Sequence, residues 1–273
     1  MKCIFRKRYI LLIAIVILIL YLFRGPLFPW NPIKSGFKRI ASSKATVYVK
    51  DYDGVSSVYS IDKLIQEEEK FHDLNFKKKF KIIIPGGETG MKRFLPWLKG
   101  STYSVKLGSV NVIYIGPTGR NSPYGIDVFL KHEISHLLIH QHVSSSKKNF
   151  EILKQGWLAD GIARFYGGPH YYEKDEFIKL WLEKGMGFDS LYEADPHEMD
   201  KDIIRLKYTY YRFFTEFLIN TFGLEQLQYY LKSYMTNPEN YKALFSEVFN
   251  EDIYAILVKF NKYMNQVRKP VVT

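Results

Sequence analysis

The chain has 273 residues, of which 47% are hydrophobic and 16% are aromatic. This composition can form a sizeable core and excludes a generally disordered protein. The only cysteine, Cys3, excludes an intrachain disulfide and a zinc site built on thiolates. The formal net charge is +11, and five of the positive charges lie within residues 1–24, so residues 25–273 carry about +6, a surplus that suits anionic surfaces.

Residues 9–23 form an unbroken apolar run behind a basic head. The run lacks a polar face and is slightly shorter than the roughly 20 residues that span a bilayer. No small-residue cleavage site follows it, which favours an uncleaved signal anchor over a cleaved signal peptide. We therefore expect residues 9–24 to contact the lipid bilayer as a transmembrane helix. The basic head predicts a cytoplasmic N-terminus and an extracytoplasmic body in a single-pass protein of a bacterial cell membrane. Such a location disfavours nucleic acid as a partner.

The next part of the chain alternates between strand and helix patterns. Residues 25–45 are rich in proline, glycine and serine and predict a linker. After it we expect a strand at 46–50, a helix at 58–74, a strand at 80–84, a short helix at 91–98 and a strand at 109–115. Beyond residue 171 only helical patterns remain. Strands and helices followed by helices alone predict the α+β class with an α-helical C-terminal half.

The motif that carries chemistry is His132-Glu133-Ile134-Ser135-His136, within a helix expected at 127–141. Two histidines four residues apart project from one face of a helix, so both imidazoles can reach one metal ion. The glutamate between them can act on a metal-bound water as a general base. This H-E-x-x-H pattern predicts a zinc hydrolase, most simply a peptidase.

Catalytic zinc usually takes three protein ligands, so a third group is required. His142 has the spacing of the metzincin pattern, but Ile139 stands where that pattern has a helix-breaking glycine. If the helix continues, His142 lies about 15 Å along its axis from His132 and cannot bind the same ion. His140 is on the correct face but one turn too far, and we expect it to pack.

A second helical segment, expected at 150–166, contains the sequence Trp157-Leu158-Ala159-Asp160-Gly161-Ile162-Ala163. It resembles the W-L-x-E-G-x-A helix of gluzincin metallopeptidases, which follows H-E-x-x-H in that family. The resemblance covers roughly residues 109–263. It implies a zincin-like domain with a small mixed β-sheet and an active-site helix, and it makes Asp160 the third Zn²⁺ ligand in place of the family's glutamate. Aspartate is one methylene shorter, so this helix must approach the metal more closely by about 1 to 1.5 Å.

The same resemblance implies two supporting parts. A strand before the first motif, at 108–115, would be an edge strand that binds an extended peptide, although an interior strand fits the sequence equally well. A tyrosine in a later helix would donate to the oxyanion of the reaction. Tyr208 falls on the family position, while Tyr210, Tyr211 and His197 are its rivals.

These features predict an enzyme, a zinc-dependent metallopeptidase acting on a peptide or protein substrate, with an endopeptidase slightly preferred. His132, His136 and Asp160 would be the metal ligands, with Glu133 and Tyr208 catalytic. A degenerate zincin that binds peptides without cutting them, an accidental motif in a structural or sensory protein, and a metzincin remain alternatives. No feature predicts an oligomeric state. The expected organisation is a head at 1–8, an anchor at 9–24, a linker at 25–45, an α/β part at 46–126, a two-helix zinc site at 127–170 and a helical subdomain at 171–273.

Overall fold

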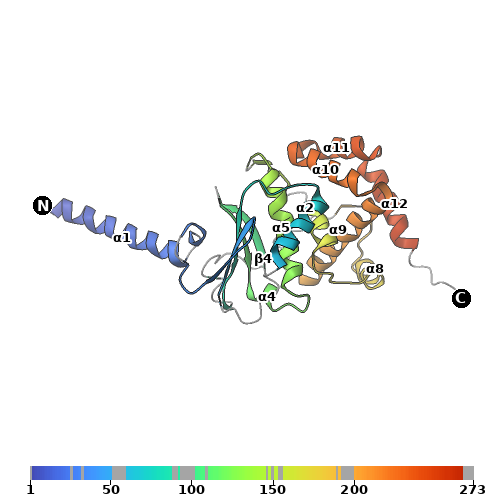
Figure 1. Ribbon diagram of the computed structural model, residues 1–273. Coiled ribbons are helices and arrows are strands. Elements are labelled where there is room, and N and C mark those ends of the chain that lie inside the picture. Colours follow the sequence, from blue (N-terminus) through green and yellow to red (C-terminus); the bar gives the residue numbers. More distant parts are fainter. Residues whose placement is uncertain are drawn as a thin grey trace. The chain divides into compact units, whose positions relative to one another are not determined.

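A computed structural model of the chain describes residues 2–24, 27–31, 34–50, 60–87, 92, 102–107, 110–145, 147–148, 151–152, 156–188, 190–191 and 200–266. The described chain is mostly helical and includes one five-stranded sheet (Figure 1). It divides into two compact units. The first comprises residues 1–65 and 78–129, and the second comprises residues 66–77 and 130–273.

The predicted transmembrane anchor is wrong. Residues 2–24 form helix α1 (Lys2–Arg24), but no helix among the described residues is both long enough and apolar enough to cross a membrane. The apolar run at 9–23 rises about 22 Å, whereas the hydrocarbon core of a bilayer is about 30 Å thick. The predicted fold class, α+β with an N-terminal transmembrane helix, is corrected to a mostly helical chain with a small sheet. The single-pass cell-membrane location, with its cytoplasmic N-terminus and extracytoplasmic body, is corrected with it.

The sheet belongs to the first unit and is built around buried apolar strands. Its order is β1-β2-β3-β5-β4. The central strands β2 (Ala45–Val49), β3 (Phe80–Ile84) and β5 (Val110–Ile115) run parallel, while β1 (Lys38–Ala41) and β4 (Thr102–Leu107) pair antiparallel at the two edges. Strand β5 is interior, so of the two alternatives left open for this segment the interior strand is the one observed.

Two of the five strands, β1 and β4, were not predicted. β1, of sequence Lys-Arg-Ile-Ala, lies within the expected linker at 25–45, and a short 3-10 helix, η1 (Phe28–Trp30), lies there too.

Helix α2 (Ile61–His72) falls inside the helix expected at 58–74. The helix expected at 91–98 lies outside the described residues except for residue 92. A short helix, α4 (Pro117–Arg120), follows β5.

Two helices carry the predicted motifs. α5 (Ile126–His142) matches the helix expected at 127–141, and α7 (Gly156–Tyr166) covers the second motif. The later helices are α8 (Lys174–Glu183), α9 (Lys201–Phe222), α10 (Leu224–Thr236), α11 (Tyr241–Phe249) and α12 (Ile253–Gln266), with the 3-10 helix η3 (Pro238–Asn240) before α11. Figure 1 colours α9 to α12 from orange to red.

The core of the second unit is rich in aromatic side chains, and it fixes the position of α7. Trp157 is buried against Phe214 of α9 and Phe245 of α11, with ring centroids 5.3 and 6.3 Å away. Gly161 lies so close to α9 that an added Cβ would come within 2.8 Å of the Tyr211 carbonyl oxygen. Glycine is therefore required where α7 and α9 meet.

Candidate active site

Helix α5 presents both motif histidines toward one point. The Nε2 atoms of His132 and His136 are 3.1 Å apart. The helix continues through Ile139 to His142 without a break, as the absence of glycine predicted. Glu133, which lies between the two histidines in sequence, is buried. The i, i+4 spacing thus gives two nitrogen ligands and a nearby carboxylate, as the motif requires.

Asp160 of α7 completes a three-atom cluster with these nitrogens. Its Oδ1 lies 3.8 Å from Nε2 of His132 and 3.5 Å from Nε2 of His136. With the 3.1 Å separation between the two nitrogens, these distances place the point equidistant from all three atoms about 2.0 Å from each, which is the length of a zinc bond to nitrogen or oxygen. Among the described residues, this is the one group of three potential ligands close enough to hold a metal ion. The donor set therefore fits the implied metal.

The electrostatics of the cluster differ between its two histidines. Burial lowers the pKa of His132 well below its ordinary value, and the positive charges of His136 and Arg164 lower it further. Burial also lowers the pKa of His136, but the Asp160 carboxylate outweighs this effect and the net pKa is raised. The His132 imidazole is thus neutral and available as a ligand. At His136 a metal ion would have to compete with a proton for the ring nitrogen. The side chains of Asp160 and His136 remain 22% and 14% exposed, so the cluster is open on their side.

Tyr208 of α9 lies near this cluster. The pKa of its phenol is raised to about 12, first by the negative charge of Asp160 and then by burial. The hydroxyl therefore keeps its proton at neutral pH and remains a hydrogen-bond donor. Its rivals are occupied elsewhere. Tyr210 is fully buried and donates to the carbonyl of Ser190, and Tyr211 is fully buried in the core.

The other histidines considered in the sequence analysis are not part of the cluster. Two lie elsewhere in the described structure, and one lies outside the described residues. Nε2 of His142 donates to the Asn75 carbonyl at 2.9 Å, so the metzincin arrangement is absent from the described residues. His140 is buried with its ring centroid 6.5 Å from that of His136, as expected for a packing residue. His197 lies outside the described residues.

A buried polar chain contacts α5 at Ser135, beside the two motif histidines. The hydroxyl of Ser135 donates to Nε2 of His72 at 2.9 Å, and Nδ1 of His72 donates to the Glu68 carbonyl at 2.9 Å. Burial lowers the pKa of His72 to about 4 and raises that of the Glu68 carboxyl to about 8. Both groups are therefore neutral at pH 7, although they stand 3.5 Å apart like an ion pair. Because this chain of hydrogen bonds is closed to solvent, we interpret it as holding α5 in position rather than as taking part in a reaction.

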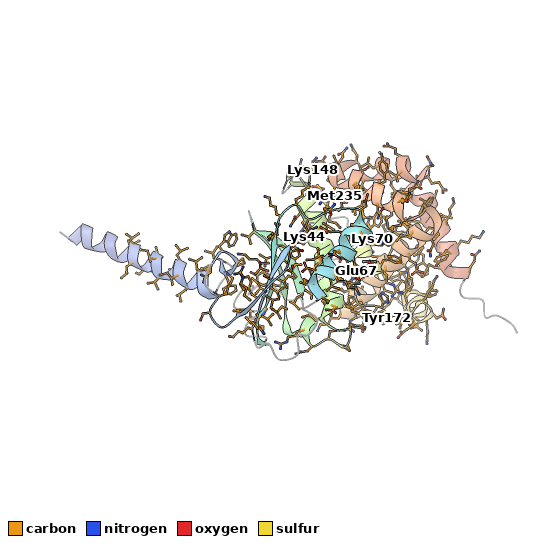
Figure 2. The ribbon with its side chains drawn as sticks, viewed as in Figure 1. Lys44, Glu67, Lys70, Lys148, Tyr172 and Met235 are labelled. Atoms are coloured by element: carbon orange, nitrogen blue, oxygen red, sulfur yellow. The ribbon has the colours of Figure 1, made fainter. Side chains whose placement is uncertain are left out.

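Glu67, the neighbour of Glu68 on α2 (Figure 2), forms an ion pair with Lys131 at 2.7 Å. Sequence reasoning missed the Ser135–His72 contact because 63 residues separate the partners. It also missed Arg164, a buried arginine one turn after Asp160 on α7. The signal for Arg164 was present, since residues four apart share a helix face.

Comparisons with known proteins give structural matches and no sequence matches. No protein-family model matches the chain, and no curated protein matches it. Native leukotriene A4 hydrolase from Saccharomyces cerevisiae is weakly similar in structure, with a TM-score of 0.47 and 14% identity over 86% of this chain. A structure of the yeast enzyme with bestatin gives a TM-score of 0.42 with the same identity and coverage of this chain. The chain spans 39% and 38% of the length of those two structures.

Proposed function

We propose that this protein is a zinc-dependent peptidase of gluzincin type with aspartate as its third metal ligand. The observation that carries the proposal is the cluster of His132, His136 and Asp160, whose three ligand atoms lie at zinc-bond distance from a common point. The order of H-E-x-x-H and W-L-x-D-G-x-A along the chain supports the same assignment. A zinc ion bound there would supply a Lewis acid that acidifies water and polarises a carbonyl.

The protein's own side chains would move the protons. Glu133 accepts a proton from the attacking water and later donates it to the leaving amine. Its burial and its place between the two histidines of α5 suit this role. The phenol of Tyr208, which stays protonated at neutral pH, donates a hydrogen bond to the oxyanion of the tetrahedral intermediate.

The first experiment separates metal binding from hydrolysis. The purified full chain is loaded with zinc, its metal content is measured, and it is incubated with a proteome-derived peptide library whose new termini are identified by mass spectrometry. We expect Glu133→Gln to retain zinc and to lose hydrolysis by a factor of about 10² to 10⁴. Unchanged hydrolysis in this variant would overturn the mechanism.

A matched pair of histidine variants tests the ligand assignment. His136→Ala should lose zinc, whereas His142→Ala removes a histidine from the same helix and should lose only the hydrogen bond to Asn75. Loss of zinc in His142→Ala but not in Asp160→Ala would favour a metzincin. Zinc binding without any hydrolysis would identify a degenerate zincin, and no zinc binding at all would mean that the motif is accidental.

A further inference from the structure

Arg164 is a buried cation with two nitrogens that lack hydrogen-bond partners among the described residues. The residue is 6% exposed, and its Nε and Nη1 atoms are buried without a hydrogen-bond partner among the described residues. Among the described residues, the ion pairs of the neighbouring Asp160 both go to histidines. A buried, unpaired guanidinium is unfavourable, and such a group in a folded protein requires an explanation.

Two tyrosines hold this guanidinium by its face. Its central carbon lies 3.9 Å from the ring centroid of Tyr208 and 5.0 Å from that of Tyr171. Arg205, on α9, lies over the same Tyr171 ring at 5.7 Å and adds a second positive charge. Stacking uses the flat face of a guanidinium and leaves the N–H donors at its edge free. The two rings therefore hold the guanidinium in place, while its Nε and Nη1 donors remain without acceptors among the described residues.

The position of Arg164 links these free donors to the metal cluster. Arg164 follows Asp160 by four residues, so both side chains lie on one face of α7. Asp160 is also the most exposed ligand of the cluster, which makes this the side from which a substrate can approach. The charge of Arg164 acts on both His132 and His136.

We propose that Arg164 is a specificity-determining residue that binds a carboxylate of the substrate next to the metal cluster. This inference rests on the proposed function. Planar carboxylates match the guanidinium fork, and charge-assisted bonds of this kind are among the strongest that proteins form. Four helical residues rise about 6 Å, and an extended peptide rises about 3.3 Å per residue. The recognised carboxylate thus lies about two residues from the scissile bond.

Two sources can supply that carboxylate, the C-terminus of a peptide or an aspartate or glutamate side chain. The test uses the zinc-loaded full chain and hexapeptides of alanine, leucine and phenylalanine in three forms. One form ends in a free carboxylate, one ends in an amide, and one is amidated but carries an internal glutamate. Hydrolysis gives kcat and KM, and calorimetry on Glu133→Gln measures binding without turnover.

We expect one carboxylate form to bind at least tenfold more tightly than the plain amide. Arg164→Gln should abolish this preference while leaving zinc content unchanged. Arg164→Lys, which keeps the charge but not the fork, should retain part of it. Arg212→Gln is the matched control, since Arg212 also has a buried Nη1 without a described partner but stands on α9 among other charges, and it should keep the full preference.

The outcomes separate this inference from the function on which it rests. Equal binding of all three peptides by the parent protein, or equal losses for all three in Arg164→Gln, would overturn the carboxylate site while leaving the peptidase intact. Carboxylate binding that depends on Arg164, without hydrolysis of any peptide, would instead overturn the peptidase and retain the site. In the peptide library, cleavages within about two residues of a carboxylate should be enriched, and a uniform distribution would contradict the proposal.

Discussion

Gly161→Ala is expected to destabilise the protein and weaken its metal site together. An added Cβ would lie 2.4 Å from Oγ1 of Thr215 and 2.8 Å from the carbonyl oxygen of Tyr211. The threonine side chain can rotate, but the carbonyl belongs to the backbone of α9. To reach an ordinary contact of about 3.4 Å, the two helices must separate by roughly 0.6 Å. Overpacking of this kind costs about 1 to 3 kcal/mol, and alanine's better helix propensity offsets about 1 kcal/mol of it.

Because two contacts fall below 3.0 Å, we expect an overpacking cost in the upper part of that range, about 2 to 3 kcal/mol. The net loss is then about 1 to 2 kcal/mol, equivalent to a decrease of about 2 to 8 °C in Tm for a unit of this size. Asp160 precedes Gly161, so zinc affinity should fall about tenfold, as it does when the support of a metal ligand is disturbed. Thermal unfolding and competition with a chelator measure the two effects. Adding Thr215→Ala removes the hydroxyl contact but not the carbonyl contact, so we expect partial recovery. Gly156→Ala is the control, since its Cβ would meet only Oδ2 of Asp160 at an ordinary 3.4 Å. A Gly161→Ala protein that melts at or above the parent temperature would refute the reasoning.

Three further predictions concern protonation, the oxyanion and the ligand. The Glu68 carboxyl has its pKa raised by burial to about 8, so the folded state keeps a proton that the unfolded state loses, and stability falls as pH rises. Between pH 4.5 and 6.5 this fall is opposed by His72, whose pKa is lowered to about 4. Urea unfolding should therefore show a net loss of about 1 kcal/mol from pH 6.5 to 8, abolished by Glu68→Gln and kept by Glu67→Gln; a flat profile in the parent would contradict this. Tyr208→Phe should lower kcat by about 10² to 10³ with zinc content and KM little changed, and an unaltered kcat would exclude the phenol as donor. Asp160→Glu should weaken zinc binding in chelator competition, because the added methylene would carry the carboxylate past a position that is already at bond distance. Tighter zinc binding in this variant would contradict the geometry.

The parts of this protein that the sequence predicted are those fixed by local periodicity. Helix α5 needed only the apolar pattern around H-E-x-x-H, and β3 was a single buried apolar run at 80–84. Asp160 required a second source, the resemblance to a known helix, because nothing local joins it to the histidines. The sequence did not predict contacts between distant segments, nor elements that lack a clear local pattern. β1 has no alternating pattern, and the Ser135–His72 hydrogen bond joins distant segments. The apolar run at 9–23 resembled a membrane span in composition, but no described helix is both long enough and apolar enough to cross a membrane.

The proposed aspartate ligand would leave α7 little freedom. A glutamate can adjust through one more rotatable bond than an aspartate. The position of the Asp160 carboxylate therefore depends more closely on the position of the α7 backbone. The metal geometry therefore depends on how α7 is held, and α9 holds it through the close approach at Gly161 and the packing of Trp157 on Phe214. Arg164 stands on the same face of the same helix, so the proposed carboxylate site shares this rigidity. The distance between the metal and a bound carboxylate is then set by one helix, which is the arrangement required to select cleavage sites by their distance from a negative charge.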